Sequence, residues 1–145
     1  MSANQTVAGH DRQVSTAVRF AASVLIVIGG VIHLKLYRDG YRHVPNANLG
    51  RSFLLNAAGA LALGVMLLVR LSRSTILAAL VLVNATLVAF GLSRTARGVF
   101  GFTETGLNPA PEAVIALVVE IAAGVLLIGL LVRQQPSPTA ATATS

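Results

Sequence analysis

Four long blocks of apolar residues, separated by short polar segments, limit the fold of this chain more than any other feature. The blocks cover residues 18–37, 52–69, 74–92 and 113–132. A helix needs about 20 mostly apolar residues, with a range of about 17–25, to cross the hydrocarbon core of a bilayer. Charged residues make up only 11% of the chain, whereas soluble domains usually carry about 25%. The sequence therefore predicts an all-α fold, a bundle of four transmembrane helices that run up and down.

The polar segments between the blocks predict how the helices are connected. Residues 70–73 leave room only for a tight turn, so the second and third helices should form an antiparallel hairpin. The connections at 35–51 and 93–112 are longer and contain aromatic and basic residues, which suits the membrane interface. Because the chain crosses the membrane an even number of times, we expect both longer loops on one side. The tight turn and both termini should lie on the other side.

The chain is short enough to form one membrane domain, which we place at residues 18–133, between two polar ends. We expect residues 1–17 to be a flexible tail, because they show no helical apolar pattern. Residues 134–145 are mainly Pro, Ser, Thr and Ala and should be disordered. A signal peptide is the alternative for the first block, since Arg12 and Arg19 precede it. No small-x-small cleavage pattern follows, so we expect a retained span.

The charge pattern points to a lipid partner and argues against nucleic acid. The net charge is +6, and the basic residues sit mainly at the ends of the apolar blocks, where they would meet lipid headgroups. They divide five to six between the two sides, which does not decide the orientation. The compact turn with Arg70 and Arg73 and the acidic second loop favour cytoplasmic termini. We therefore expect a multi-pass protein of the plasma membrane with its termini in the cytoplasm.

Four polar side chains interrupt the apolar blocks or lie just inside them, and they form our candidate intramembrane site: His33, Asn56, Asn84 and Glu120. A charge at mid-membrane costs about 2.5–3.5 kcal/mol on insertion scales, so such residues usually face the bundle interior. The two asparagines also suit interhelical hydrogen bonds, and His33 could reach the headgroups. Glu120 is either a proton or ligand site or a protonated acid in a structural hydrogen bond.

Depth and helical phase predict that these four side chains meet. All four fall in the half of the bilayer that faces the longer loops, and small residues flank Asn56 and Glu120 at intervals of four. An up-and-down bundle brings its first and last helices together. We therefore expect His33 and Glu120 to point at a common interior site, with Asn56 and Asn84 lining the same cavity.

The most distinctive stretch is the first longer loop, where we expect four side chains to contact the membrane interface: Tyr37, Arg38, Tyr41 and Arg42. The pattern H-L-x-L-Y-x-x-G-Y-R-x-V-P over residues 33–45, followed by F-L-L-N-A over residues 53–57, resembles a group of small four-helix membrane proteins from high-GC actinobacteria. The resemblance covers about a third of the chain. It implies a fold and a membrane location and does not imply a reaction.

The sequence favours a protein that is not an enzyme. It has no cysteine, which excludes disulfides, thiolate catalysis and Cys-ligated metal centres. We find no catalytic constellation, no cofactor signature and no metal-binding pattern, and a single histidine within the spans argues against haem. We therefore expect a structural, accessory or interaction protein, with a second copy or another membrane protein as partner. A proton-coupled carrier of a small or lipophilic solute that uses Glu120, and a membrane enzyme acting on a lipid or quinone, remain the alternatives.

Overall fold

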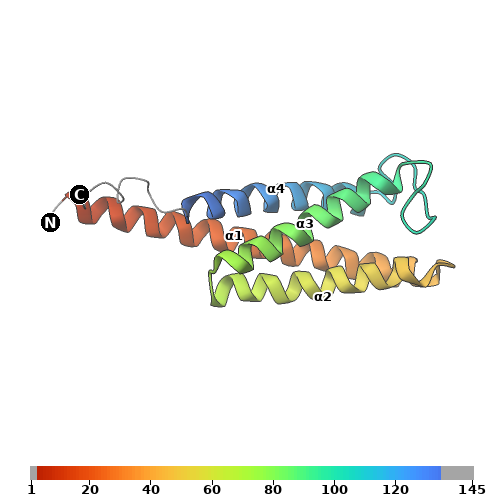
Figure 1. The fold of residues 1–145 in the computed structure, drawn as a ribbon, viewed down its shortest axis with the longest axis horizontal. Helices are drawn as coiled ribbons and strands as arrows, with labels where there is room; N and C mark the ends of the chain where they lie inside the picture. The colour runs from red at the N-terminus through yellow and green to blue at the C-terminus, as the bar shows by residue number, and fades with distance from the viewer. Residues whose placement is uncertain (1–2, 135–145) are drawn as a thin grey trace, which may run out of the picture.

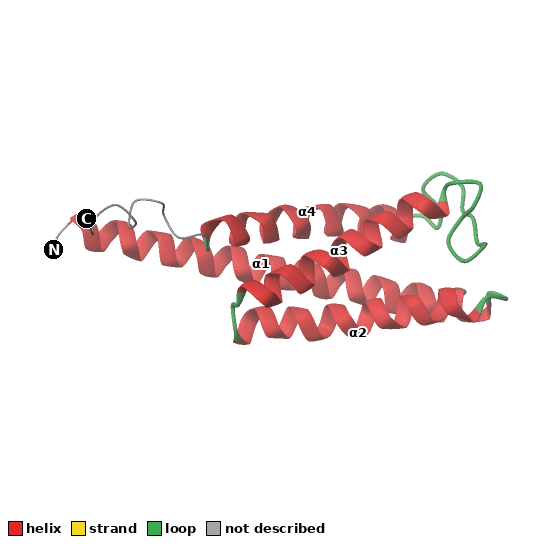
Figure 2. Cartoon of the chain, in the orientation of Figure 1, coloured by secondary structure: helices red, strands yellow, loops and turns green. Residues whose placement is uncertain are grey.

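The computed structural model describes residues 3–134, with the side chains of residues 13–134. Four long helices alternate in direction and form one bundle (Figure 1). Loops of different length connect them, and the first of these contains a single 3-10 turn, η1 (Figure 2). The elements in chain order are α1 (Ala3–Asp39), η1 (Tyr41–His43), α2 (Ala47–Val69), α3 (Arg73–Ser93) and α4 (Glu112–Arg133). The prediction of an all-α four-helix bundle is confirmed.

Each of the four helices is long and apolar enough to cross a membrane, as the four apolar blocks predicted. The chain is thus a multi-pass membrane protein. The start of α1, the end of α4 and the α2–α3 turn lie at one end of the bundle, and the two longer loops lie at the other (Figure 1). We call these the turn end and the loop end.

Helix α1 begins much earlier than we predicted. It runs from Ala3 to Asp39 and extends beyond the rest of the bundle at the turn end (Figure 1). We predicted a flexible tail at residues 1–17 and did not expect the helix that the structure shows from Ala3 onward. Nucleating a helix is the unfavourable step, and the apolar span supplies the nucleus, so further turns can be added to it at little cost. No proline interrupts residues 3–17. The predicted disordered segment lies almost entirely outside the described residues.

Capping side chains set the starts of α2 and α3. The Asn46 side chain accepts a hydrogen bond from the Asn48 amide at 3.0 Å, and Ser72 Oγ accepts one from the Thr75 amide at 3.1 Å. Each cap satisfies a backbone donor that has no partner within its own helix. Since α2 ends at Val69 and Ser72 caps α3, the connection is as tight as the sequence predicted.

The helices pack in a closed ring in which α1 contacts α2 and α4, and α3 contacts the same two helices. The first and last helices are thus neighbours. Lysine 35 strengthens this pairing at the loop end, because Lys35 Nζ lies 2.7 Å from Asp39 Oδ2 and 2.7 Å from Glu112 Oε1 on α4. The interior of the turn end is filled by fully buried apolar side chains: Leu67, Ile76, Leu127 and Leu130.

Helices α1 and α2 approach each other closely through small residues. A Cβ atom on Gly30 would lie 2.7 Å from Ala60 Cβ, and one on Gly64 would lie 2.6 Å from Val27 Cγ2. Ser23 Oγ uses the close approach to donate a 2.6 Å hydrogen bond to the Gly64 carbonyl. Helix α3 does not run alongside α2 in this way. It starts beside the end of α2 and crosses toward the start of α4 (Figure 1).

Candidate functional site

A cavity of about 330 Å³ lies inside the loop end of the bundle, with walls from all four helices and both longer loops. Most of the wall is apolar and includes Leu36, Phe53, Leu82, Phe90 and Leu117. Ligand sites typically have volumes of about 300–1,000 Å³ and apolar walls with a few polar groups. The polar residues of this cavity come from all four helices and both loops: His33, Tyr41, Ser52, Asn56, Thr86, Ser93, Arg94, Glu104 and Glu120.

Glu120 is the most deeply placed acid in the described part of the chain. Only 5% of its surface is exposed, and it makes no hydrogen bond or ion pair with any described residue. Its carboxyl lies against the backbone of α1, where a Cβ atom on Gly29 would be 2.9 Å from Glu120 Oε1. Glycine at position 29 thus leaves the space that the carboxyl occupies.

His33 lies one turn along α1 from the same glycine. Its Nδ1 is 2.8 Å from the Gly29 carbonyl oxygen, and because a carbonyl only accepts, Nδ1 carries the proton. When the ring is neutral, Nε2 is its hydrogen-bond acceptor. The ring also packs against Phe53, with centroids 5.3 Å apart. His33 and Glu120 line the same cavity and flank Gly29, although no hydrogen bond joins them.

Asn56 links α2 to α3 and keeps one acceptor unused. Its Nδ2 donates to Thr86 Oγ1 at 2.5 Å, and Thr86 Oγ1 donates in turn to the Leu82 carbonyl at 3.0 Å. Since the single hydroxyl proton of Thr86 is committed to Leu82, Asn56 must be the donor, which fixes the orientation of its amide. Asn56 Oδ1 is left buried without a hydrogen-bond partner.

Asn84 does not line the cavity, so our prediction that it shares the site is wrong. It is exposed on the outer surface of α3, where its Nδ2 donates to the Leu80 carbonyl at 2.8 Å. Helical phase explains the difference. The cavity wall of α3 includes Leu82 and Thr86, and Asn84 lies two residues from each, on the opposite side of the helix.

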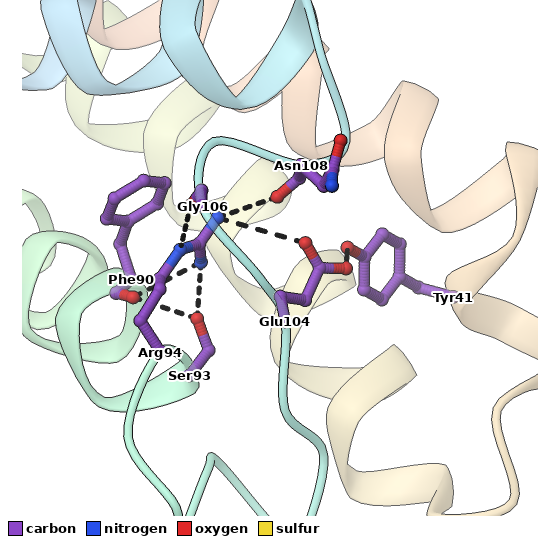
Figure 3. A network of polar contacts seen from close by, with 7 residues as sticks. All are labelled: Tyr41, Phe90, Ser93, Arg94, Glu104, Gly106 and Asn108. Carbon is purple, nitrogen blue, oxygen red and sulfur yellow. Dashed lines mark hydrogen bonds and ion pairs between the residues drawn. The ribbon is translucent and has the colours of Figure 1, made fainter.

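A polar network joins the second loop to the end of α3 (Figure 3), and two of its members, Arg94 and Glu104, line the cavity at the loop end. Arg94 Nε donates to the Gly106 carbonyl at 3.1 Å, and Nη2 donates to the Asn108 carbonyl at 2.7 Å. The guanidinium carbon lies 3.6 Å from the centroid of the Phe90 ring. Nη2 also lies 3.8 Å from Glu104 Oε2, so the arginine both holds the loop in shape and pairs with its acid.

Tyr41 connects the first loop to this network. Its hydroxyl donates to Glu104 Oε1 (Figure 3), and its ring stacks on Phe53 with centroids 4.3 Å apart. Burial and the neighbouring Glu104 carboxylate raise the pKa of the Tyr41 phenol well above its usual range, so it stays a neutral donor.

The four side chains of the first loop that we predicted to contact the membrane interface differ in their surroundings. Tyr41 lines the cavity, and its hydroxyl faces Glu104 (Figure 3). Tyr37 is half-buried and packs beside Gly50 of α2. Arg38 and Arg42 are exposed, as a contact with lipid headgroups requires.

Arg94 and Glu104 are site residues that sequence reasoning missed, because it counted them only as loop charges. They meet because the loop folds back, with the Glu104 amide donating to the Ser93 carbonyl at 2.8 Å. The fold-back requires Gly98, whose φ is +64° and where a Cβ atom would lie 2.2 Å from the Phe102 carbonyl oxygen. The sequence did contain one sign of this pairing: Glu104 lies in a loop rich in aromatic residues and glycine that directly follows Arg94.

Within residues 13–134, no group of three or more His, Asp or Glu side chains is placed to hold a metal ion. No family model, curated protein or solved structure matches the chain. The resemblance to small actinobacterial membrane proteins stays a prediction. The functional argument therefore depends on the cavity and on Glu120.

Proposed function

We propose that this chain is a non-enzymatic membrane protein that binds a small lipophilic molecule in its loop-end cavity, with Glu120 as the polar anchor. The observation that carries the proposal is the acid itself, which is 5% exposed, lines a cavity of about 330 Å³ and has no partner among the described residues. An ionisable group inside a membrane domain is costly, and it marks a functional site by default. The apolar walls suit a lipophilic body.

The hydroxyl groups of the cavity favour binding over catalysis. Ser52, Thr86 and Ser93 each donate to a backbone carbonyl of their own helix. His33 uses Nδ1 in the same way, and no hydroxyl is hydrogen-bonded to its ring within the described residues. A nucleophile needs an adjacent base, and this pairing is absent from the cavity wall.

A proton-coupled carrier that uses Glu120 is the alternative, and the turn end argues against it. A carrier must open its site to each side of the membrane in turn. Leu67, Ile76 and Leu127 are fully buried between the cavity and the turn end. Binding from the loop end requires no such opening, so it is the simpler function for this arrangement.

Equilibrium dialysis with 1-methylnaphthalene, a neutral probe small enough for the cavity, tests the proposal. The purified protein in nonionic micelles should take up the probe saturably, above the uptake of protein-free micelles. The Ala89→Leu variant fills part of the cavity wall. Since overpacking costs about 1–3 kcal/mol, this variant should bind about tenfold more weakly.

The matched control is Ala62→Leu, which adds the same atoms at an exposed position of α2 that does not line the cavity. It should bind like the wild type. If the wild type, both variants and protein-free micelles took up the same amount of 1-methylnaphthalene, the proposal would be wrong.

The exposed Asn84 supports a second role, association with another copy of this chain. An amide that faces lipid keeps unsatisfied hydrogen-bonding groups, and a facing helix can satisfy them. Because the chain has no cysteine, one cysteine introduced at exposed Ser74 can carry a donor or an acceptor dye. Energy transfer between labelled copies in liposomes should fall in Asn84→Leu, with association about tenfold weaker. The exposed Val118→Leu should leave it unchanged, and equal transfer in both variants would exclude an Asn84 contact.

We also infer that the protein lies in the plasma membrane with its turn end in the cytoplasm, on the basis of the compact turn with Arg70 and Arg73 and the acidic second loop. Single cysteines at exposed Ser74 and Thr105 mark the turn end and the loop end. In intact cells a membrane-impermeant maleimide should label Thr105→Cys and spare Ser74→Cys. The reverse pattern would invert the orientation.

A further inference from the structure

The hydroxyl groups and the guanidinium nitrogens that line the cavity all donate to protein acceptors, and only the amide of Asn56 keeps a second N–H group without a hydrogen bond among the described residues. The hydroxyls of Ser52, Thr86 and Ser93 donate to backbone carbonyls, and the Tyr41 hydroxyl donates to Glu104. Each of the three nitrogens of the Arg94 guanidinium donates to at least one backbone carbonyl. A ligand that needs more than this one donor from the protein would therefore have to break existing bonds.

Several acceptors on the cavity walls have no hydrogen-bond partner among the described residues. Glu120 makes no hydrogen bond there, and Asn56 Oδ1 and Glu104 Oε2 are buried without one. Glu104 Oε2 has a cation nearby, since Arg94 Nη2 lies 3.8 Å away, whereas Glu120 has none within the described part of the chain. In a neutral His33 ring Nε2 is a further acceptor, because Nδ1 donates to the Gly29 carbonyl. Glu120 and His33 flank the same glycine, so these two lie on one part of the wall. Buried polar groups are normally hydrogen-bonded, so this set is complementary to a ligand that donates.

From this pattern we propose that the ligand is a lipophilic amine, whose ammonium group donates hydrogen bonds to Glu120 and to the neighbouring His33. The inference rests on the proposed function, since it names the chemical class of the molecule in the same cavity. The apolar body of the amine would lie against Phe53, Phe90 and Leu117, which belong to the cavity wall.

The charge of the Glu120 carboxylate favours an ammonium ligand over neutral donors and over anions. An anionic ligand would meet the Glu120 carboxylate and would find no free cation, because Arg94 is occupied by carbonyls and by Glu104. A neutral alcohol could donate once but brings no charge that would favour the carboxylate form of Glu120. An ammonium supplies both the charge and several donors, and hydrogen bonds between charged groups are the stronger kind.

Two naphthalene probes that differ only in the amine test the inference. Equilibrium dialysis at neutral pH in nonionic micelles should show that 1-naphthylmethylamine binds about tenfold or more tightly than 1-methylnaphthalene, after subtraction of protein-free micelles. The anionic 1-naphthoic acid should bind more weakly than either. These three measurements use the wild-type protein and do not depend on the folding of any variant.

Two variants, each with one acid replaced by the corresponding amide, test whether Glu120 causes the preference for the amine probe over the hydrocarbon probe. In Glu120→Gln the ratio of the two affinities should fall to about one, because glutamine cannot supply the charge. Glu112→Gln removes an acid from the same helix outside the cavity and should keep the wild-type ratio. Equal wild-type affinities for the amine and the hydrocarbon would overturn the amine while leaving the proposed function intact. An amine preference that survives Glu120→Gln would also overturn it. Failure of every probe to bind would remove the proposed function, and the inference with it.

Discussion

Replacing Gly64 with leucine should destabilise the bundle by more than about 3 kcal/mol, the upper end of the usual cost of overpacking. The reason is that Gly64 has the least room for a side chain of all helical glycines in the described residues, since a Cβ atom there would lie 2.6 Å from Val27 Cγ2. A larger side chain must push α1 away, and this also breaks the 2.6 Å hydrogen bond from Ser23 to the Gly64 carbonyl. The midpoint of unfolding by SDS in mixed micelles measures the loss.

Gly129→Leu is the matched control for this prediction. A Cβ atom on Gly129 would meet no atom within 4 Å, so the added side chain faces open space. Both substitutions remove a glycine from a helix interior, which by itself favours the helix by several tenths of a kcal/mol. Similar midpoints for the two variants would mean that α1 and α2 do not depend on their close approach.

Part of this contact could be predicted from the sequence. The repeat of Asn56, Ala60 and Gly64 at intervals of four predicted a buried small-residue face on α2, and the structure buries Ala60 and Gly64 against α1. The corresponding repeat through Glu120 was less informative, since a Cβ atom on Gly124 would reach only an ordinary 3.5 Å contact with Val83. The spacing of small residues shows which face can approach a neighbour. The rotation of each helix against its neighbours decides which face does.

The positions of the four helices followed directly from the lengths of the apolar blocks, because lipid requires every backbone polar group to bond within its own helix. The outward direction of Asn84 did not follow. We assumed that a polar residue at mid-membrane faces the bundle interior, but α3 already presents Leu82, Thr86 and Phe90 to the cavity. A fixed helical phase allows only one side to face inward, so Asn84 is left outside.

The loop-end network depends on contacts that spacing cannot reveal. Tyr41 and Glu104 are 63 positions apart, yet they are hydrogen-bonded above the cavity. Their meeting requires the fold-back at Gly98 and the docking of the first loop through Asn46, whose Nδ2 donates to the Phe100 carbonyl at 2.9 Å. Irregular loops follow no period, so the sequence could predict that these loops lie at the interface but not that they close over a site.

Glu120→Met should make the protein more stable, by about 1–3 kcal/mol. The carboxyl is almost fully buried and makes no hydrogen bond with any described residue, so the substitution removes a desolvated polar group without breaking a bond. Methionine is unbranched and flexible, so it can take the space beside Gly29 that the carboxyl occupies now. The SDS unfolding midpoint should therefore rise. When a residue destabilises the folded protein and is nevertheless present, the reason is that the function requires it.

Glu112→Met controls for the loss of an acid in an anionic detergent. Glu112 lies on the same helix, and its partner is Lys35 at the exposed loop end, so its removal should change the midpoint little. A midpoint that rises in Glu120→Met but not in Glu112→Met would show that the Glu120 carboxyl does not stabilise the fold. It would then differ from Asn56, which joins two helices by its hydrogen bond to Thr86. A fall would show that the carboxyl holds α4 to its neighbours, and the cavity would then lose its polar anchor. The sign of this one change thus decides whether Glu120 serves the fold or the ligand.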